Sequence, residues 1–164
     1  TQQYYQIENT PEQTETFLAM EQICSDILDP VIDSFGEITL TYGFCSKNLE
    51  KQIKKNESPR ILSKLDQHAG YELDSKGYRI CERLGFAVDF ISAQNSSLEI
   101  MQWIARHLKF DRIYFYGSKK PLHVSIGPDE SHQCVAMLPT QKTGRRMPRK
   151  ISRLEPLPEF LIGT

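Results

Sequence analysis

The sequence lacks the features that mark several large classes of protein. No apolar run approaches the roughly 20 residues of a membrane-spanning helix, and no secretory signal peptide is recognisable. The net charge is −1, from 20 basic and 21 acidic residues, so no global field draws the chain to nucleic acid or to an anionic membrane. Any such partner has to be held by a local patch of charge.

Cysteine is used sparingly, and the four cysteines form no C-x-x-C pair. This spacing excludes a zinc ribbon and a thioredoxin-type motif. A disulfide scaffold is not expected either, because a chain of this length can build a core without covalent staples. We therefore expect reduced, partly buried thiols and a cytoplasmic location. The chain begins with Thr1 rather than methionine, which fits a processed start or a domain of a longer protein.

The chain is long enough for one domain and too short for two comfortable ones, so residues 1–164 are predicted to fold together. We expect the core to cover residues 11–138, and residues 139–164 to form a basic, proline-rich extension. Apolar residues at helical spacing predict a helix that begins near Pro11 and is interrupted at Pro30.

The rest of the core alternates short helices with strands. Ser97 is the predicted cap of an amphipathic helix, and a shorter helix is expected over residues 49–54. β-Branched and aromatic runs predict strands over residues 37–44, 85–91, 111–116, 122–126 and 135–138, with a hairpin turn at residues 74–77. This order predicts an α+β fold, in which helices flank a small antiparallel sheet.

Two of the predicted strands carry an ionisable residue inside an apolar run. Asp89 lies in the sequence FAVDFI, and His123 lies in PLHVSI. A buried carboxylate must be paired, hydrogen-bonded or bound to a metal, and imidazole nitrogen with carboxylate oxygen suits a tetrahedral zinc ion. Together with His68, these residues form the predicted metal site. Taken singly, a strand histidine can also be satisfied within the core, and Asp89 can cap a helix or pair with Arg83.

Four segments, in order, resemble the zinc D-Ala-D-Ala carboxypeptidases and their Hedgehog-type fold relatives. The segments are LDP with the following ITLTYGFCSKN, then GFAVD, FDRIY and LHVS. They span roughly residues 12–128, which is most of the chain. The resemblance implies a divergent member of the Hedgehog/DD-peptidase-like fold. It also implies that Asp89 and His123 bind Zn²⁺, and that a metal-bound water attacks an amide or ester carbonyl of a peptide-like or other small substrate.

The first metal ligand departs from the family pattern. Glu82 stands where the resemblance places a zinc-binding histidine. The nearest upstream histidine is His68, and the predicted hairpin between them can fold it back to the metal. His68 is therefore the expected first ligand, with Glu82 and Cys81 as the alternatives.

The catalytic positions depart as well. Cys45 replaces the arginine that grips a substrate carboxylate in the family, and Tyr116 replaces the catalytic glutamate. We expect Cys45 and Ser125 at the substrate-binding positions, and Tyr116 and Glu82 at the catalytic ones. Because a zinc peptidase needs a carboxylate to take a proton from the metal-bound water, Glu82 or Glu72 is the candidate for a relocated base.

These losses leave two other functions open. One is a non-catalytic, metal-containing binding domain that keeps the fold. The other is a nucleic-acid-directed protein, because residues 140–150 carry five cations and no acid and such a segment can neutralise phosphates. A solvated loop is the simpler interpretation of this segment. The cations are Lys142, Arg145, Arg146, Arg149 and Lys150.

Overall fold

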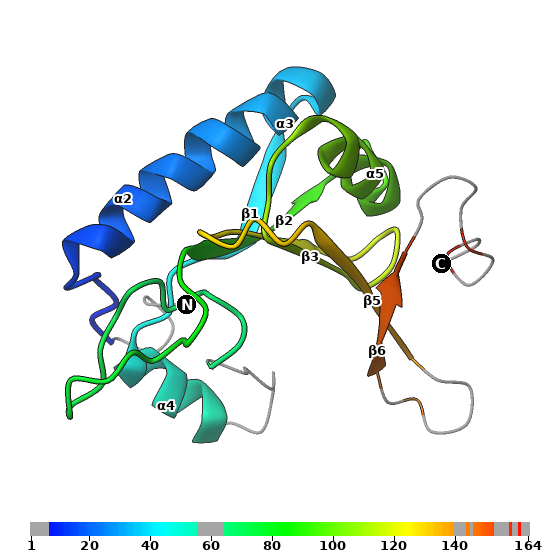
Figure 1. The fold of residues 1–164 in the computed structure, drawn as a ribbon. Helices are drawn as coiled ribbons and strands as arrows, with labels where there is room; N and C mark the ends of the chain where they lie inside the picture. Colours follow the sequence, from blue (N-terminus) through cyan, green and yellow to red (C-terminus); the bar gives the residue numbers. More distant parts are fainter. Residues whose placement is uncertain are drawn as a thin grey trace.

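The computed structural model describes residues 7–55, 64–139, 144, 146–152, 158 and 161. Six strands in this part of the chain form one sheet. They are β1 (Ile38–Tyr42), β2 (Phe86–Ser92), β3 (Arg112–Phe115), β4 (Leu122–Ile126), β5 (Gln133–Pro139) and β6 (Arg146–Ile151). Their order across the sheet is β1-β2-β4-β3-β5-β6 (Figure 1). The α+β class predicted from the sequence is confirmed.

One pairing makes the sheet mixed. β5 runs parallel to β3, whereas the other four pairings are antiparallel. Residues 127–132 carry the chain past Arg112, the first residue of β3, so that β5 runs opposite to β4 and pairs with the other edge of β3. The prediction of a purely antiparallel sheet was therefore wrong, because it did not include this crossing.

The first helical stretch changes to a π-helix just before Pro30 and continues through that proline. α2 (Thr14–Ile23) passes into a π-helical turn, η1 (Cys24–Leu28), which leads directly into α3 (Asp29–Phe35). Pro30 occupies the first turn of α3, where a missing backbone N–H is tolerated. The π turn just before it shifts the hydrogen-bond pattern by one residue, so the helix continues past the proline.

The other two helices agree closely with the sequence pattern. α5 (Ser97–His107) begins after Ser96, which forms a capping box with Glu99. The cap lies one residue before the predicted one. α4 (Lys47–Lys55) contains the predicted short helix.

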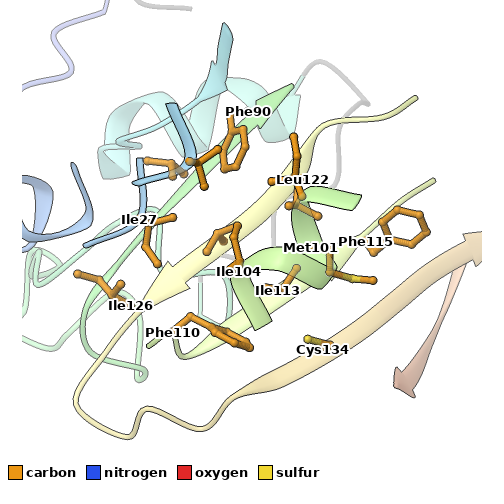
Figure 2. Packing of buried hydrophobic residues seen from close by; sticks show 14 of the residues in the cluster. Ile27, Phe90, Met101, Ile104, Phe110, Ile113, Phe115, Leu122, Ile126 and Cys134 are labelled. Carbon is orange, nitrogen blue, oxygen red and sulfur yellow. The ribbon is translucent and has the colours of Figure 1, made fainter. Parts of the chain in front are cut away.

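α2, α3 and α5 cover one face of the sheet (Figure 1). Alternate strand residues point to this face and pack against the helices, as Figure 2 shows. The sheet contributes Phe86, Val88, Phe90, Ile113, Phe115, Leu122, Val124, Ile126, Cys134 and Ala136. Ile151 and Leu161 join the same cluster, so the region expected to be an extension contributes to the core.

The opposite face of the sheet, called the site face below, carries polar and aromatic residues. Asp89, Tyr114 and His123 are paired across neighbouring strands and lie one position out of phase with the core residues. α4 and the segment of residues 64–84 lie on this side of the sheet, away from α2, α3 and α5 (Figure 1). Polar groups on the site face are therefore enclosed by loops and not by helices of the main core.

The described segment between α4 and β2 has little regular structure. The expected hairpin is reduced to a single bridge between Leu73 and Arg79. A turn closes it, in which the Gly77 N–H donates to the Asp74 carbonyl over 2.9 Å. His68 lies before this turn, in a loop that reaches back to the sheet.

β6 was not expected to be a strand. Its sequence, RMPRKI, contains three cations and a proline, and only its last residue is buried. It pairs with β5 and forms the outer edge of the sheet, a position where proline and charged side chains are tolerated. Arg146, Arg149 and Lys150 are exposed strand residues, whereas Lys142 and Arg145 lie outside the described residues.

Candidate metal centre

Three ionisable residues from distant parts of the chain meet on the site face. His68 comes from the loop after α4, Asp89 from the middle of β2, and His123 from β4. The Asp89 Oδ1 atom lies 2.8 Å from His123 Nδ1 and 3.3 Å from His68 Nε2. One ligand atom from each residue lies within 4.8 Å of the other two. The structure thus brings together the three residues predicted as metal ligands.

The register of the sheet explains how two of the three residues meet. Asp89 and His123 are directly opposite each other in the β2–β4 pairing, and directly paired residues project to the same face. His68 is held by a main-chain contact instead, since the Cys45 N–H donates to the His68 carbonyl over 3.0 Å. Strand alternation therefore places two of the residues, and the tertiary fold places the third.

The separations suit a small divalent cation. Zinc bonds of about 2.0–2.1 Å place tetrahedral ligand atoms about 3.3 Å apart. The His68–Asp89 separation of 3.3 Å already has this value, and the His123–Asp89 separation of 2.8 Å needs to open by about half an ångström. His68 Nδ1 and His123 Nε2 are buried without a hydrogen-bond partner within the described part of the chain. The protein alone therefore leaves this polar cluster incompletely satisfied.

Charge and burial oppose each other at Asp89. Burial raises the pKa of its carboxyl, but hydrogen bonds from His123 and His68 outweigh burial and hold the pKa well below its usual range. Burial lowers the pKa of His123, although its hydrogen bond to Asp89 acts in the other direction. The site therefore favours a charged Asp89 carboxylate beside a neutral His123 imidazole, which are the protonation states that bind a metal.

Three tyrosines line the cluster. The Tyr42 ring lies 4.6 Å from the His68 ring, and the Tyr114 ring lies 4.9 Å from the His123 ring. Burial, with the nearby negative charge of Asp89, raises the pKa of Tyr116 to about 12. The Tyr42 and Tyr114 rings pack against the two imidazoles, whereas 24% of the Asp89 side chain stays exposed.

The remaining predicted residues fall into two groups. Cys45 lies beside the cluster, because its main chain contacts His68, and Ser125 lies on the site face two residues from His123. The Ser125 hydroxyl, however, is bonded to the main chain of Arg112. Tyr116 is half-buried near Asp89.

The alternatives for the first ligand do not join the cluster. Glu82 is exposed and Cys81 is buried, and neither is among the grouped ligand atoms of the described residues. Glu72 has a structural role, since its carboxylate accepts from the Glu12 and Gln13 N–H groups and from the Thr16 hydroxyl. These contacts satisfy the start of α2.

Asp66 is a residue of the site that the sequence pattern missed. Its Oδ1 atom is buried and has no hydrogen-bond partner among the described residues. Although burial dominates the pKa shifts of Tyr42 and Tyr116, the charge of Asp66 also raises both. The charge of Asp66 therefore acts on two tyrosines of the site face. The only signal in the sequence is its position two residues before His68.

Gln67 is the second residue that was missed, and it fixes the loop that carries His68. It has a left-handed backbone, with φ of 60°, and a side chain that is only 1% exposed. The side-chain amide donates to Leu84 O over 2.7 Å, to Asp111 Oδ2 over 3.1 Å and to Ile126 O over 3.2 Å. We call this group of contacts the amide latch. It ties the loop to the sheet directly beside a predicted ligand.

Comparison with known protein families, curated proteins and solved structures found no match to this chain. Within the described residues, no helix is long and apolar enough to cross a membrane. The functional interpretation therefore depends on the geometry of the site and on the resemblance of its sequence segments.

Proposed function

We propose that this chain is a divalent-metal-dependent hydrolase in which His68, Asp89 and His123 bind Zn²⁺. The observation that carries the proposal is the grouping of their ligand atoms within 4.8 Å, in a cluster whose two histidines are 4% and 2% exposed. Two imidazoles and one carboxylate form a ligand set found in catalytic zinc sites, where the fourth position holds water. Zinc in such a site supplies a nucleophilic water near neutral pH and polarises a carbonyl.

Two features around the cluster support the proposal of a hydrolase. Asp66 offers a buried carboxylate oxygen without a hydrogen-bond partner among the described residues, which suits a group that accepts a proton from an attacking water. The tyrosine rings limit access of bulk water. We propose an amide or ester as substrate, in line with the resemblance to the zinc D-Ala-D-Ala carboxypeptidases.

Metal analysis is the first test. We expect the purified chain to bind one equivalent of zinc, and a His123→Ala variant to lose it. His107→Ala is the matched control, because His107 is exposed on α5 and contacts the main chain of Trp103. Equal zinc content in both variants would show that the cluster does not hold the metal.

Hydrolysis is the second test, and it separates two candidate bases. With a panel of peptide amides and activated esters, Asp66→Asn is expected to keep zinc and to lose about 10²- to 10⁴-fold in rate, the usual contribution of a general base. Glu82→Gln is expected to retain the rate. The reverse result would assign the base to Glu82.

A non-catalytic metal-binding domain is the second candidate function. Cys45 favours this alternative, because it occupies the position where the resemblance places an arginine that binds the substrate carboxylate. It is also only 4% exposed. Zinc bound at one equivalent without hydrolysis of any substrate in the panel would support this alternative.

A further inference from the structure

The site face continues beyond the metal cluster to a basic edge of the sheet. Directly paired residues project to the same face, so the pairings can be followed from strand to strand. Tyr114 pairs with His123, Val135 pairs with Tyr114, and Lys150 pairs with Val135. One row of side chains therefore runs from the predicted metal ligand on β4 to a cation on β6.

Arg146 belongs to the same face and turns back toward the site. It pairs with Pro139 at the other end of the β5–β6 ladder, four residues from Lys150, and strand alternation puts both cations on one face. Its guanidinium carbon lies 5.2 Å from the centre of the Tyr116 ring. Tyr116 in turn lies close enough to Asp89 for that carboxylate to affect its pKa. Arg146 thus packs on an aromatic ring that follows Tyr114 along the site face.

Met147, Arg149 and Ile151 of β6 point to the opposite side. Arg149 pairs with Ala136, and Met147 pairs with Leu138; both β5 residues belong to the core side of the sheet. The cations of β6 are therefore divided between two faces. This division does not suit a continuous strip for a nucleic-acid backbone, but it concentrates Arg146 and Lys150 on the face of the metal cluster.

The positive charge of these two residues is not neutralised within the described part of the chain. No described carboxylate forms an ion pair with Arg146 or Lys150. Neighbouring strands lie about 4.8 Å apart, so β6 is about 14 Å from β4 across the sheet. An arginine side chain that folds back over Tyr116 shortens that span. The span between the guanidinium and the metal cluster is therefore within the length of an extended small molecule.

We propose that Arg146, assisted by Lys150, binds an anionic oxygen group of the substrate, a carboxylate or a phosphate, while another part of the same molecule reaches the metal centre. This inference rests on the proposed function and names its substrate class. A guanidinium presents a planar fork of donors that matches both kinds of anion.

The test uses phenyl phosphate and benzoate as probes of the two anion chemistries. Each is titrated into the zinc-loaded chain and into the metal-free chain, and binding is followed by NMR. We expect Arg146→Gln to weaken binding of at least one probe about tenfold, which corresponds to the loss of one charge-assisted contact. Arg149→Gln is the matched control on the same strand and is expected to change the dissociation constant less than twofold. Thermal unfolding checks that both exposed-residue variants are folded.

The outcomes separate the inference from the proposed function. A larger effect on phenyl phosphate points to a phosphate substrate, and a larger effect on benzoate points to a carboxylate. If Arg146→Gln and Arg149→Gln weaken probe binding equally, the anions are attracted by diffuse positive charge and the subsite proposal fails. Tight binding of a single-stranded oligonucleotide that both variants weaken equally would have the same meaning. No measurable binding of either probe would also overturn it. If zinc fails to bind but probe binding still depends on Arg146, the anion subsite stands and the hydrolase proposal fails.

Discussion

Removing the amide latch is expected to weaken both the fold and the metal site. In a Gln67→Ala variant, the Leu84 and Ile126 carbonyls and the Asp111 carboxylate each lose a donor. The amide nitrogen carries only two hydrogens, so these three contacts share the equivalent of two full hydrogen bonds. Each lost bond that leaves a buried acceptor unpaired costs about 1–3 kcal/mol. Asp111 Oδ2 keeps its contact with Arg112, and the variant also removes the Gln67 Oε1 atom, which is buried without a partner among the described residues. We therefore expect a loss in the lower part of the summed range, about 3 kcal/mol in the free energy of unfolding.

The backbone conformation does not change this estimate. Glutamine and alanine both carry a Cβ atom and are both disfavoured at the φ of 60° observed for Gln67. Gln67→Gly removes that strain, and we expect it to be about 1 kcal/mol more stable than Gln67→Ala. Comparison of the two variants therefore separates the side-chain contacts from the backbone strain.

The measurement is thermal unfolding combined with a zinc titration. For a domain of this size, a loss of about 3 kcal/mol lowers the melting temperature by about 6–12 °C. Because the latch holds the loop of His68, we also expect zinc affinity to fall at least tenfold. Gln94→Ala, at an exposed position, is the control and should stay within about 0.5 kcal/mol of the parent chain. Parent-like stability of Gln67→Ala would refute the latch, and lower stability with unchanged zinc affinity would refute its role in positioning His68.

Three further predictions follow from contacts already described. The folded-state pKa values of both Asp89 and His123 are lowered. The metal-free chain should therefore lose stability as the pH falls below about 6.5, the pKa of an unfolded histidine, and lose more below about 4, the pKa of an unfolded aspartate. Denaturant titrations across this range test the trend, and Asp89→Asn should flatten its part below about pH 4. Glu72→Ala should destabilise the chain by about 2 kcal/mol through the start of α2 and leave zinc affinity unchanged, whereas a drop in affinity would contradict its assignment as a cap. Gly85→Ala places a Cβ atom 1.9 Å from a carbonyl oxygen and should lower the free energy of unfolding by more than about 3 kcal/mol. Gly77→Ala has open space around it and should lower the free energy of unfolding by about 1 kcal/mol. Similar chemical-denaturation midpoints for the two variants would exclude a steric cause.

The sequence pattern singled out Asp89 and His123, although for His123 the residues alone left a histidine satisfied within the core as an alternative. Each interrupts an apolar strand, and the cost of burying an ionisable group without a partner makes such a residue conspicuous. His68 was harder, because its place depends on a loop fixed by distant contacts. Gln67 and Asp66 gave no comparable signal, since a polar residue in an irregular segment is ordinary until its burial is known.

The strand pattern was predictable where residues alternate in character, and not where pairing is non-local. β6 carries charges and a proline, so it does not read as a strand. Only the edge position beside β5 makes such a sequence acceptable. The parallel β3–β5 pairing was likewise hidden, because it depends on the path of residues 127–132 and not on the composition of either strand. Pro30 was expected to interrupt a helix, and the π turn before it could not be read from spacing alone.

The edge formed by β6 also limits how copies of this chain can associate. An open sheet edge is a template for another strand, and that is one route to fibrils and strand-swapped dimers. A strand that approaches β6 finds no N–H donor at Pro148. It also meets the positive charges of Arg146 and Lys150 on one face of the sheet and of Arg149 on the other. Two such edges repel each other and cannot form an unbroken ladder of hydrogen bonds. β6 therefore also hinders the addition of a further strand at this edge of the sheet.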